Sequence, residues 1–306
     1  MNSTERLKYA KKEAKISITG NSSLALLKIL TGIFTGSMAV LADGVDSSFD
    51  ILTSIITYIA SVISNKPPDK EHPFGHEKAE TVASKTLSLI IFFAGGQLIL
   101  SSVQKLFTGK IDLNVMYIAL IVSVISCVVK FFLYKYKLKV GKTIQNKAII
   151  ADALNMRSDV LISLSVFISV LLVELTGMNW IDPVAGILVG IIVIKTAIEL
   201  FWENAQELME GTLKGDKIYN NVYNALKTVD NIHNPHKMRI RKFGYKYIID
   251  LDIEVNPVMT VREAHNITKN VEKAIKEQIP NVYEVLIHVE PLGNIENENY
   301  GVNKEE

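Results

Sequence analysis

The sequence has little cysteine and almost no excess of charge of either sign. It contains one cysteine, Cys127, inside an apolar run, which excludes a disulfide framework and a thiolate zinc cluster. We expect the Cys127 side chain to serve in packing and not in function. The formal net charge is +1, so no global positive field favours a nucleic-acid partner. Any argument from charge therefore has to be local.

Residues 1–15 are polar and basic and lack the apolar core and cleavage signal of a signal peptide. We expect them to be a retained cytoplasmic N-terminal segment. Apolar residues, in contrast, are abundant at 48% of the chain. They gather in six runs of roughly 20 residues, the length that crosses a bilayer. The runs are 16–39, 40–63, 82–107, 113–133, 149–175 and 180–201. A soluble helical bundle is the alternative, but six such runs favour an all-α six-helix transmembrane bundle over 16–204.

Lysine and arginine alternate along the short loops and so predict the orientation in the membrane. The basic stretches are 1–15, 66–78 and 135–147, whereas the turns at 35–38 and 174–180 contain no base. Lys105 and Lys110 run against this alternation. Because basic residues accumulate on the cytoplasmic side, both termini are expected in the cytoplasm, with the protein in the cell (plasma) membrane.

The chain changes character after Asn204, where charged and apolar residues become mixed. Periodicity predicts a small cytoplasmic α+β domain over 205–292, in the order α-β-β-α-β. The expected elements are a helix at 216–229, strands at 237–242 and 247–255, a helix at 260–278 and a strand at 282–289. Thr260 is placed to cap the second helix. The polar tail, 293–306, is expected to be disordered.

An internal repeat carries the strongest chemical signal. Residues 39–52 and 148–161 match at a constant offset. The aligned polar positions are Asp43 with Asp152, Asp46 with Asn155, and Asp50 with Asp159. A charged aspartate at the centre of a membrane helix costs about 2.5 to 3.5 kcal/mol unless it is paired or bound to a cation, so function is the default reading.

The spacing within each copy favours a metal site. Side chains four residues apart project from one face of a helix. Two helices that each offer two such oxygen ligands can therefore converge on a divalent cation, with Asp46, Asp50, Asn155 and Asp159 as the four ligands. The alternative is that the aspartates cap helices, which suits the first position of each copy.

These motifs resemble the cation diffusion facilitator family. The resemblance rests on the repeat, on 37–43 (Ser-Met-Ala-Val-Leu-Ala-Asp), on 66–80 with its His-Pro-Phe-Gly-His core, and on 180–186 (Trp-Ile-Asp-Pro-Val-Ala-Gly). It implies a homodimer with six membrane helices and a metallochaperone-like cytoplasmic domain. It also implies exchange of divalent metal for protons by alternating access, with no prosthetic group. The family's transport tetrad falls on Asp46, Asp50, Asn155 and Asp159.

The tetrad departs from that of zinc-transporting relatives because it contains no histidine. All-oxygen ligands suit harder ions, so Mn²⁺ is the preferred cargo, with Zn²⁺ and Fe²⁺ as alternatives and Co²⁺ and Cd²⁺ as further candidates. Asn and Asp at these positions also resemble the manganese-exporting branch. Without a histidine, carboxylates must carry the protons, because clustered aspartates resist simultaneous ionisation. Asp46, Asp50 and Asp159 are thus predicted to bind both metal and protons.

The loop before the third apolar run offers a second group of ligands. Resemblance assigns Asp69, His72 and His76 to a cytoplasm-proximal metal site, with the two histidines at the start of the third helix. The alternative is a solvated loop. Lys78 and Glu210 resemble a charge pair that joins the membrane and cytoplasmic domains of relatives, although exposed pairs are weak.

The cytoplasmic domain contains further candidate ligands on or near positions where relatives bind a regulatory metal. They are His236, Asp252, His265, His288 and Glu290. Strand alternation puts His288 and Glu290 on one face. In the membrane domain, Lys28, Lys85 and Lys195 lie inside apolar runs. Those near helix ends can snorkel, whereas Lys28 is deeper and needs a partner.

Two other classes of protein use similar residues. An intramembrane aspartyl protease needs one carboxylate from each of two helices sharing a proton. This chain instead has paired ligands twice and lacks a Gly-x-Gly-Asp motif, so no enzymatic activity is expected. A metal-sensing membrane scaffold binds ions without moving them, but relatives of that type tend to lose tetrad positions that are kept here.

Overall fold

A computed structural model describes residues 3–35, 38–108, 116–176, 178, 180–211 and 217–294. The chain divides into two compact units, Met1–Ala205 and Gln206–Glu306, each with its own apolar core. Of the tail that the sequence predicts to be disordered, residues from 295 onward lie outside the described part.

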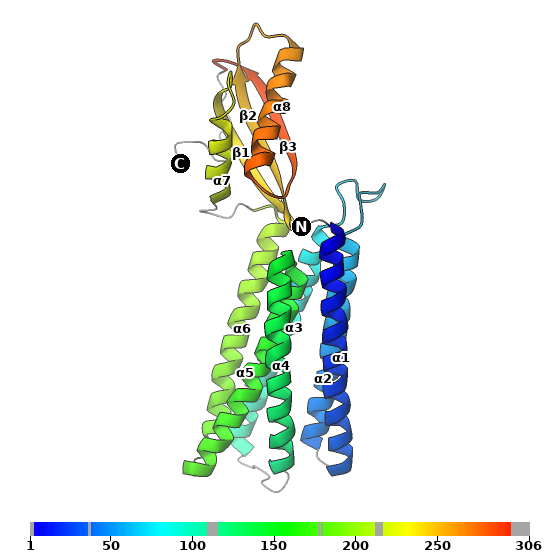
Figure 1. The fold of residues 1–306 in the computed structure, drawn as a ribbon. Helices are drawn as coiled ribbons and strands as arrows, with labels where there is room; N and C mark the ends of the chain where they lie inside the picture. Colours follow the sequence, from blue (N-terminus) through cyan, green and yellow to red (C-terminus); the bar gives the residue numbers. More distant parts are fainter. Residues whose placement is uncertain are drawn as a thin grey trace. The chain divides into compact units, whose positions relative to one another are not determined.

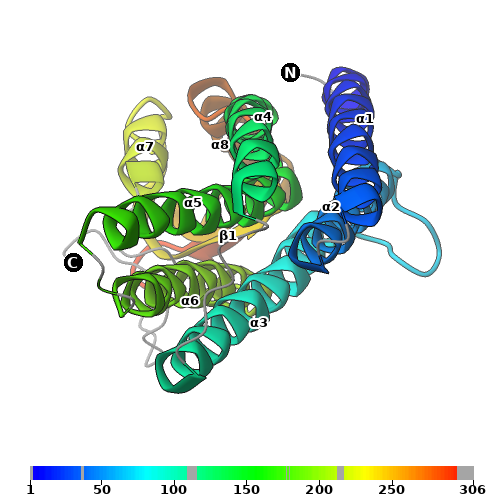
Figure 2. The same cartoon turned by 90° about the horizontal axis from the view of Figure 1, so that it is seen from below.

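Helices and the loop at 65–77 make up most of the described part of the first unit, and each predicted apolar run overlaps mainly with one helix (Figures 1 and 2). The helices are α1 (Ser3–Thr35), α2 (Met38–Ser64), α3 (Lys78–Thr108), α4 (Met116–Ile144), α5 (Lys147–Thr176) and α6 (Ile181–Leu208). Helix α2 contacts α1, α3 and α5, and α4 packs against α5. The elements of the two copies of the repeat, α2 and α5, are thus neighbours.

The helices exceed the length that a bilayer requires. They contain between 27 and 33 residues, which corresponds to about 40 to 50 Å, against about 30 Å of hydrocarbon. Among the described residues, two segments combine this length with the apolarity of a membrane span, Lys78–Gln104 and Pro183–Leu208. The number of helices that cross the membrane therefore stays a prediction.

Helix α1 begins well before the apolar run that predicts it, because its polar first turns pack into the bundle. Arg6 is 2% exposed. Its Nη2 lies 3.1 and 3.2 Å from the carboxylate oxygens of Glu80, and its Nε donates to the carbonyl of Ile144 at 2.8 Å. A buried charge is tolerated where such partners satisfy it. The N-terminal segment is therefore a helix that belongs to the bundle.

Helices α3 and α6 approach each other closely at two glycines. A Cβ atom on Gly95 would lie 3.2 Å from the carbonyl oxygen of Gly190, and a Cβ atom on Gly190 would lie 3.1 Å from that of Gly95. Small residues permit this approach between membrane helices. Next to the crossing, Leu87 and Ile91 of α3 pack with Val193 of α6 in a buried apolar cluster. This packing holds α3 and α6 together.

The second unit has the predicted order α-β-β-α-β. Its elements are α7 (Lys217–Leu226), β1 (His233–Phe243), β2 (Lys246–Val255), α8 (Val261–Gln278) and β3 (Val282–Pro291). Strand β2 is central, antiparallel to β1 and parallel to β3. A parallel pair needs a long crossover, which α8 provides. The first and last strands extend beyond their predicted limits.

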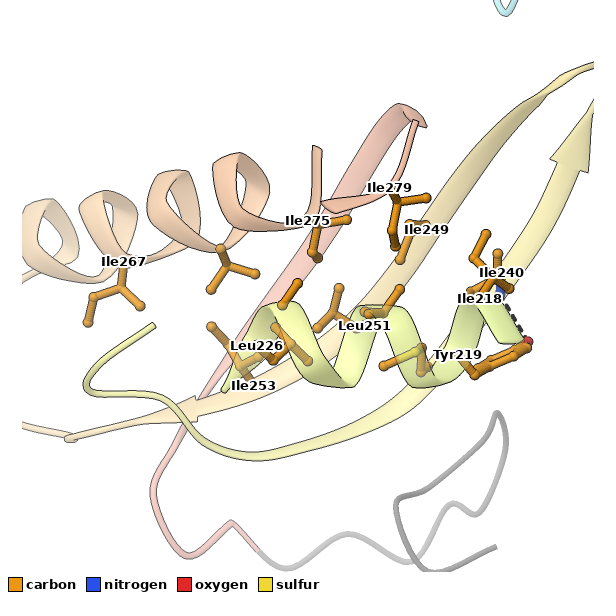
Figure 3. Close-up of a cluster of buried hydrophobic side chains, with 14 of the residues drawn as sticks. Ile218, Tyr219, Leu226, Ile240, Ile249, Leu251, Ile253, Ile267, Ile275 and Ile279 are labelled. Carbon is orange, nitrogen blue, oxygen red and sulfur yellow. Dashed lines mark hydrogen bonds between the residues drawn. The ribbon is translucent and has the colours of Figure 1, made fainter. Parts of the chain in front are cut away.

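The core of the second unit lies between the sheet and its two helices (Figure 3). Ile275 of α8 and Val222 of α7 are fully buried against Ile249 and Ile253 of β2. The Tyr219 hydroxyl at the edge of this cluster has a partner, since the backbone N–H of Ile240 donates to it at 3.3 Å (Figure 3). Because the helices cover one face of the sheet, the candidate ligands on its strands lie on the other face.

Candidate metal transport site

One aspartate from each copy of the repeat meets the other inside the helical bundle. Asp50 lies on α2 and Asp159 on α5. Between them is Lys130 of α4, whose Nζ lies 2.7 Å from Asp50 Oδ2 and 2.9 Å from Asp159 Oδ2. Asp50 and Lys130 are buried, and the Asp159 side chain is 26% exposed. The repeat thus brings two carboxylates together, with an ammonium that was not among the predicted site residues.

The other two members of the tetrad are described to different degrees. Asn155 precedes Asp159 by one turn on α5 and is 8% exposed. Asp46 precedes Asp50 by one turn on α2, but its side chain lies outside the described residues. Residues one turn apart share a helix face. The backbone is therefore compatible with a four-ligand group, which as a whole stays a prediction.

A second lysine joins the same two helices closer to the other end of α4. Lys137 is fully buried and forms an ion pair with Asp152 Oδ2. Thr53 donates to Asp152 Oδ1 at 2.9 Å, and Ser54 donates to Oδ2 at 3.3 Å. The capping interpretation is thus wrong for Asp152, whose carboxylate bonds side chains of α2 and α4. The predicted position of Lys137 in a loop is also wrong, because α4 continues through it to Ile144.

The sequence contains a signal for both lysine–aspartate pairs that did not enter the prediction of the site. Lys130 and Lys137 are seven residues apart on α4, and Asp152 and Asp159 are seven apart on α5. Two turns of helix return a side chain to nearly the same face. In antiparallel neighbours, the first lysine then meets the second aspartate, as observed. Matched spacing of opposite charges was the available clue.

The three lysines that lie inside the predicted apolar runs have ordinary partners. Lys28 is 2% exposed and donates to the Ser47 hydroxyl at 3.0 Å. Lys85 lies over the ring of Phe201, with Nζ 4.7 Å from the ring centroid. Lys195 is exposed and pairs with a glutamate one turn along α6. Among these lysines, Lys28 is the deeply buried one, as predicted.

The loop before α3 brings its three predicted ligands together. The ligand atoms of Asp69, His72 and His76 all lie within 4.8 Å of one another. Both histidines precede α3, which begins at Lys78, so their predicted place on that helix is wrong. The backbone N–H groups of His72 and Glu71 donate to Asp69 at 2.7 and 3.0 Å. Chiefly through the bond from His72, these donors hold the pKa of Asp69 below its ordinary value.

A second candidate cluster lies on the sheet of the second unit. It consists of His236 on β1, Glu254 on β2 and Glu290 on β3, whose ligand atoms lie within 4.8 Å of one another. Glu254 was not predicted, although strand alternation places it on the same face as Asp252. Burial raises the pKa of Glu254. Hydrogen bonds from the Asn234 side-chain amide and from the backbone N–H of Gly293 outweigh burial and hold the pKa below its ordinary value.

Irregular backbone aims His236 into this cluster. The register between β1 and β2 shifts on both sides of His236, and its neighbours Asn234 and Lys237 have positive φ angles of 41° and 48°. Bulges of this kind turn a side chain out of its regular direction. The Nδ1 of His236 lies 2.7 Å from the Asn234 carbonyl, which can only accept. Nδ1 therefore carries the proton, and Nε2 is left as the ligand atom, 3.4 Å from Glu290 Oε2.

The remaining predicted ligands of this unit are not members of the three-residue cluster, although His288 lies beside it. Asp252 forms an ion pair with Lys237 at 3.7 Å. His288 is exposed and lies 3.6 Å from Glu290, on the face that alternation predicts. His265 lies on the exposed side of α8 and is absent from both candidate clusters in the described part of the chain.

Lys78 and Glu210, the predicted interdomain pair, belong to different units. Lys78 opens α3 in the first unit. Within its own unit, Glu210 accepts a hydrogen bond from Arg241 at 2.8 Å. This bond, more than the accompanying charge, raises the pKa of Arg241 above its ordinary value. The pairing of Lys78 with Glu210 stays a prediction.

Buried carboxylates that face each other across a helical bundle, joined to an α+β unit with its own ligand cluster, define a class of cation-handling proteins. Two family models match the chain, the cation efflux transmembrane domain over residues 14–209 and the cytoplasmic domain of cation efflux proteins over 215–292. The chain therefore belongs to the cation efflux, or cation diffusion facilitator, family and is a membrane metal efflux transporter.

Individual relatives agree with this assignment. The chain is 32% identical to the manganese efflux system protein MneP of Bacillus subtilis (strain 168), over 94% of this chain and 98% of that protein. It is 29% identical to MneS of the same organism, over the same shares. Among solved structures, the metal-bound C-terminal domain of the CzcD transporter from Thermotoga maritima is 40% identical, covers 28% of this chain and all of that one, and has a TM-score of 0.27. Since the chain belongs to a family of cation efflux transporters, the alternative of an intramembrane protease is wrong.

Proposed function

We propose that this transporter exports Mn²⁺ in exchange for protons through Asp46, Asp50, Asn155 and Asp159. The observation that carries the proposal is the convergence of Asp50 and Asp159 on a single ammonium, to within 2.9 Å. Two carboxylates that share one cation at this distance can share another. Each lies one turn from a further oxygen-bearing residue, which supports a four-ligand site.

The chemistry of the ligands supports manganese. All four are carboxylate or amide oxygens, which suit hard divalent ions, whereas imidazole suits zinc. Two relatives that match nearly the whole chain are named as manganese efflux proteins. Zn²⁺ and Fe²⁺ are the competing cargo ions, with Co²⁺ and Cd²⁺ behind them.

Protons replace the departing ion on the same carboxylates. Like charges held close together in a poorly solvated site resist simultaneous ionisation, which favours protonation of Asp46, Asp50 and Asp159 once the cation has left. The exchange proceeds by alternating access. In this proposal all six helices cross the plasma membrane, and both termini face the cytoplasm, as the basic loops favour.

The second unit forms a homodimer and senses metal. Its match to the cytoplasmic domain of cation efflux proteins supports the dimer. His236, Glu254 and Glu290 are the proposed ligands of a regulatory ion in this unit, supported by their close grouping. Asp69, His72 and His76 form the proposed cytoplasm-proximal site on the same grounds. Lys78 and Glu210 remain the proposed charge pair between the units.

Transport in proteoliposomes tests the proposal. Purified protein is reconstituted, and uptake of Mn²⁺, Zn²⁺, Fe²⁺, Co²⁺ and Cd²⁺ is followed together with internal pH. We expect Mn²⁺ to move with a counterflow of protons and expect Asn155→His to shift preference toward Zn²⁺. Movement of Zn²⁺ without Mn²⁺ by the unmodified protein contradicts the selectivity, and metal binding without flux favours the sensing scaffold.

A further inference from the structure

Lys130 occupies the centre of the proposed transport site. It is 5% exposed, and it projects from α4, a helix that contributes no member of the predicted tetrad. Its ammonium is the cation that Asp50 and Asp159 share. Among the described residues, neither carboxylate accepts a hydrogen bond from a hydroxyl group, and this one ammonium offsets one of their two negative charges.

The ammonium and a cargo ion cannot use the same oxygens at the same time. A divalent transition metal binds carboxylate oxygens at about 2.0 to 2.2 Å, and the Lys130 nitrogen already lies 2.7 and 2.9 Å from the two Oδ2 atoms. A metal ion on these atoms would lie against the ammonium, and two cations in contact in a poorly solvated interior repel strongly. Binding of cargo therefore requires the ammonium to withdraw.

The neighbouring pair shows what a purely structural lysine looks like in this bundle. Lys137 and Asp152 are 0% and 2% exposed, and hydroxyls of Thr53 and Ser54 saturate the carboxylate. In contrast, the Asp159 side chain is 26% exposed. The Lys137–Asp152 pair is thus closed to solvent. The group at Lys130 is open to exchange of its cation.

We propose that Lys130 is a tethered counter-ion that competes with the cargo ion for Asp50 and Asp159. The proposal rests on the proposed function, because it takes these carboxylates as cargo ligands. The ammonium withdraws when the metal binds and returns when the metal leaves. It then offsets one negative charge of the pair and leaves the other to a proton. A flexible four-carbon stem that bears a compact point charge suits this movement. Lys130 thereby weakens metal binding and speeds release.

Metal affinity, measured separately from transport, tests the proposal. Mn²⁺ binding to the purified full-length protein is titrated with His72, His76 and His236 replaced by alanine, so that the other clusters do not contribute. We expect Lys130→Met to bind Mn²⁺ about tenfold more tightly or better and to release it more slowly in a rapid-mixing exchange experiment. Lys130→Arg keeps the charge and should bind like the parent protein.

A matched control removes a different lysine from the same bundle. Lys85 lies over the ring of Phe201, away from the aspartates, and Lys85→Met should leave Mn²⁺ affinity unchanged. Unchanged or weaker binding in folded Lys130→Met overturns the proposal. Where that variant does not fold, Lys130→Gln keeps a polar side chain without the charge and is read by the same criterion.

Two variants distinguish an error in the transport site from an error in the role of Lys130. If the double variant Asp50→Asn with Asp159→Asn keeps full Mn²⁺ affinity, the proposed transport site itself is wrong. If that double variant loses binding while Lys130→Met leaves affinity unchanged, the site stands and the tethered counter-ion is wrong.

Discussion

Helices α4 and α5 are joined by two lysine–aspartate pairs with opposite properties. At one, Lys137 and two hydroxyls satisfy Asp152 completely and out of reach of solvent. At the other, two turns away, Lys130 is shared between Asp50 and Asp159. A carboxylate with all its partners supplied by the protein is a structural element, and exchanging its partners is costly. A carboxylate that shares one cation with another can accept a replacement.

The cytoplasmic unit repeats this difference. Glu263 is satisfied at the start of α8, where it accepts from the Thr260 backbone at 2.8 Å while its own N–H donates to the Thr260 hydroxyl. Glu290 is 4% exposed, yet within the described residues neither of its carboxylate oxygens accepts a hydrogen bond. Buried acceptors without donors are costly, so their presence points to a ligand. Satisfied carboxylates thus predict stability effects, and unsatisfied ones predict binding effects.

The largest expected effect is at the shared pair. Asp159→Asn keeps the shape of the side chain but removes the charge that binds both ammonium and cargo, so Mn²⁺ uptake into proteoliposomes should fall to the level of protein-free liposomes. Asp50→Asn should do the same. Size-exclusion profiles should match those of the parent protein. Substantial uptake in either variant contradicts the tetrad assignment.

The saturated pair should affect stability instead. Asp152→Asn leaves the Lys137 charge buried without its partner, which costs about 3 to 5 kcal/mol. A large loss of thermal stability in detergent measures this effect. The double variant Lys137→Met with Asp152→Leu removes both charges and should recover most of the loss. If Asp152→Asn were as stable as the parent protein but had lost transport, the Lys137–Asp152 pair would not be the structural pair proposed here.

The open cluster of the cytoplasmic unit should show a binding effect of intermediate size. Glu290→Gln removes a charged ligand, and metal affinity should fall about tenfold. The titration uses full-length protein in which the transport and loop sites carry Asp50→Asn, Asp159→Asn, His72→Ala and His76→Ala. His265→Ala, on the exposed side of α8, is the matched control and should bind normally. An equal loss in both variants argues against the cluster.

The smallest effect is expected at the satisfied carboxylate of the same unit. Thr260→Ala removes the cap of α8 and should cost about 1 kcal/mol, seen as faster amide exchange in the first turn of that helix. Bonds from the Thr260 backbone and hydroxyl hold the pKa of Glu263 below its ordinary value. Because that pKa is lowered on folding, the stabilisation is present above the ordinary pKa and is lost as pH falls through the lowered one. Metal affinity should not change.

Local pattern was sufficient for much of this fold. The lengths of the apolar runs identify the helices, and alternation identifies the order of elements in the second unit. The constant offset between 39–52 and 148–161 singles out Asp50 and Asp159 before any contact is known. The capping box at Thr260 is equally local, because it needs only residues three apart.

The sequence by itself determined that the chain has apolar helices, a repeated set of carboxylates and a separate α+β unit, since each of these is a pattern along the chain. Only the tertiary structure decided which charges are buried and which partners they receive. Arg6 and Lys137 look like solvent-facing bases in sequence, and Glu254 looks like an ordinary strand residue, yet each is buried with partners from other elements. The physical reason is that a charge can be buried only where another segment supplies its counter-charge. That choice depends on which helices and strands pack side by side, and at Lys130 it places a cation where the cargo is proposed to bind.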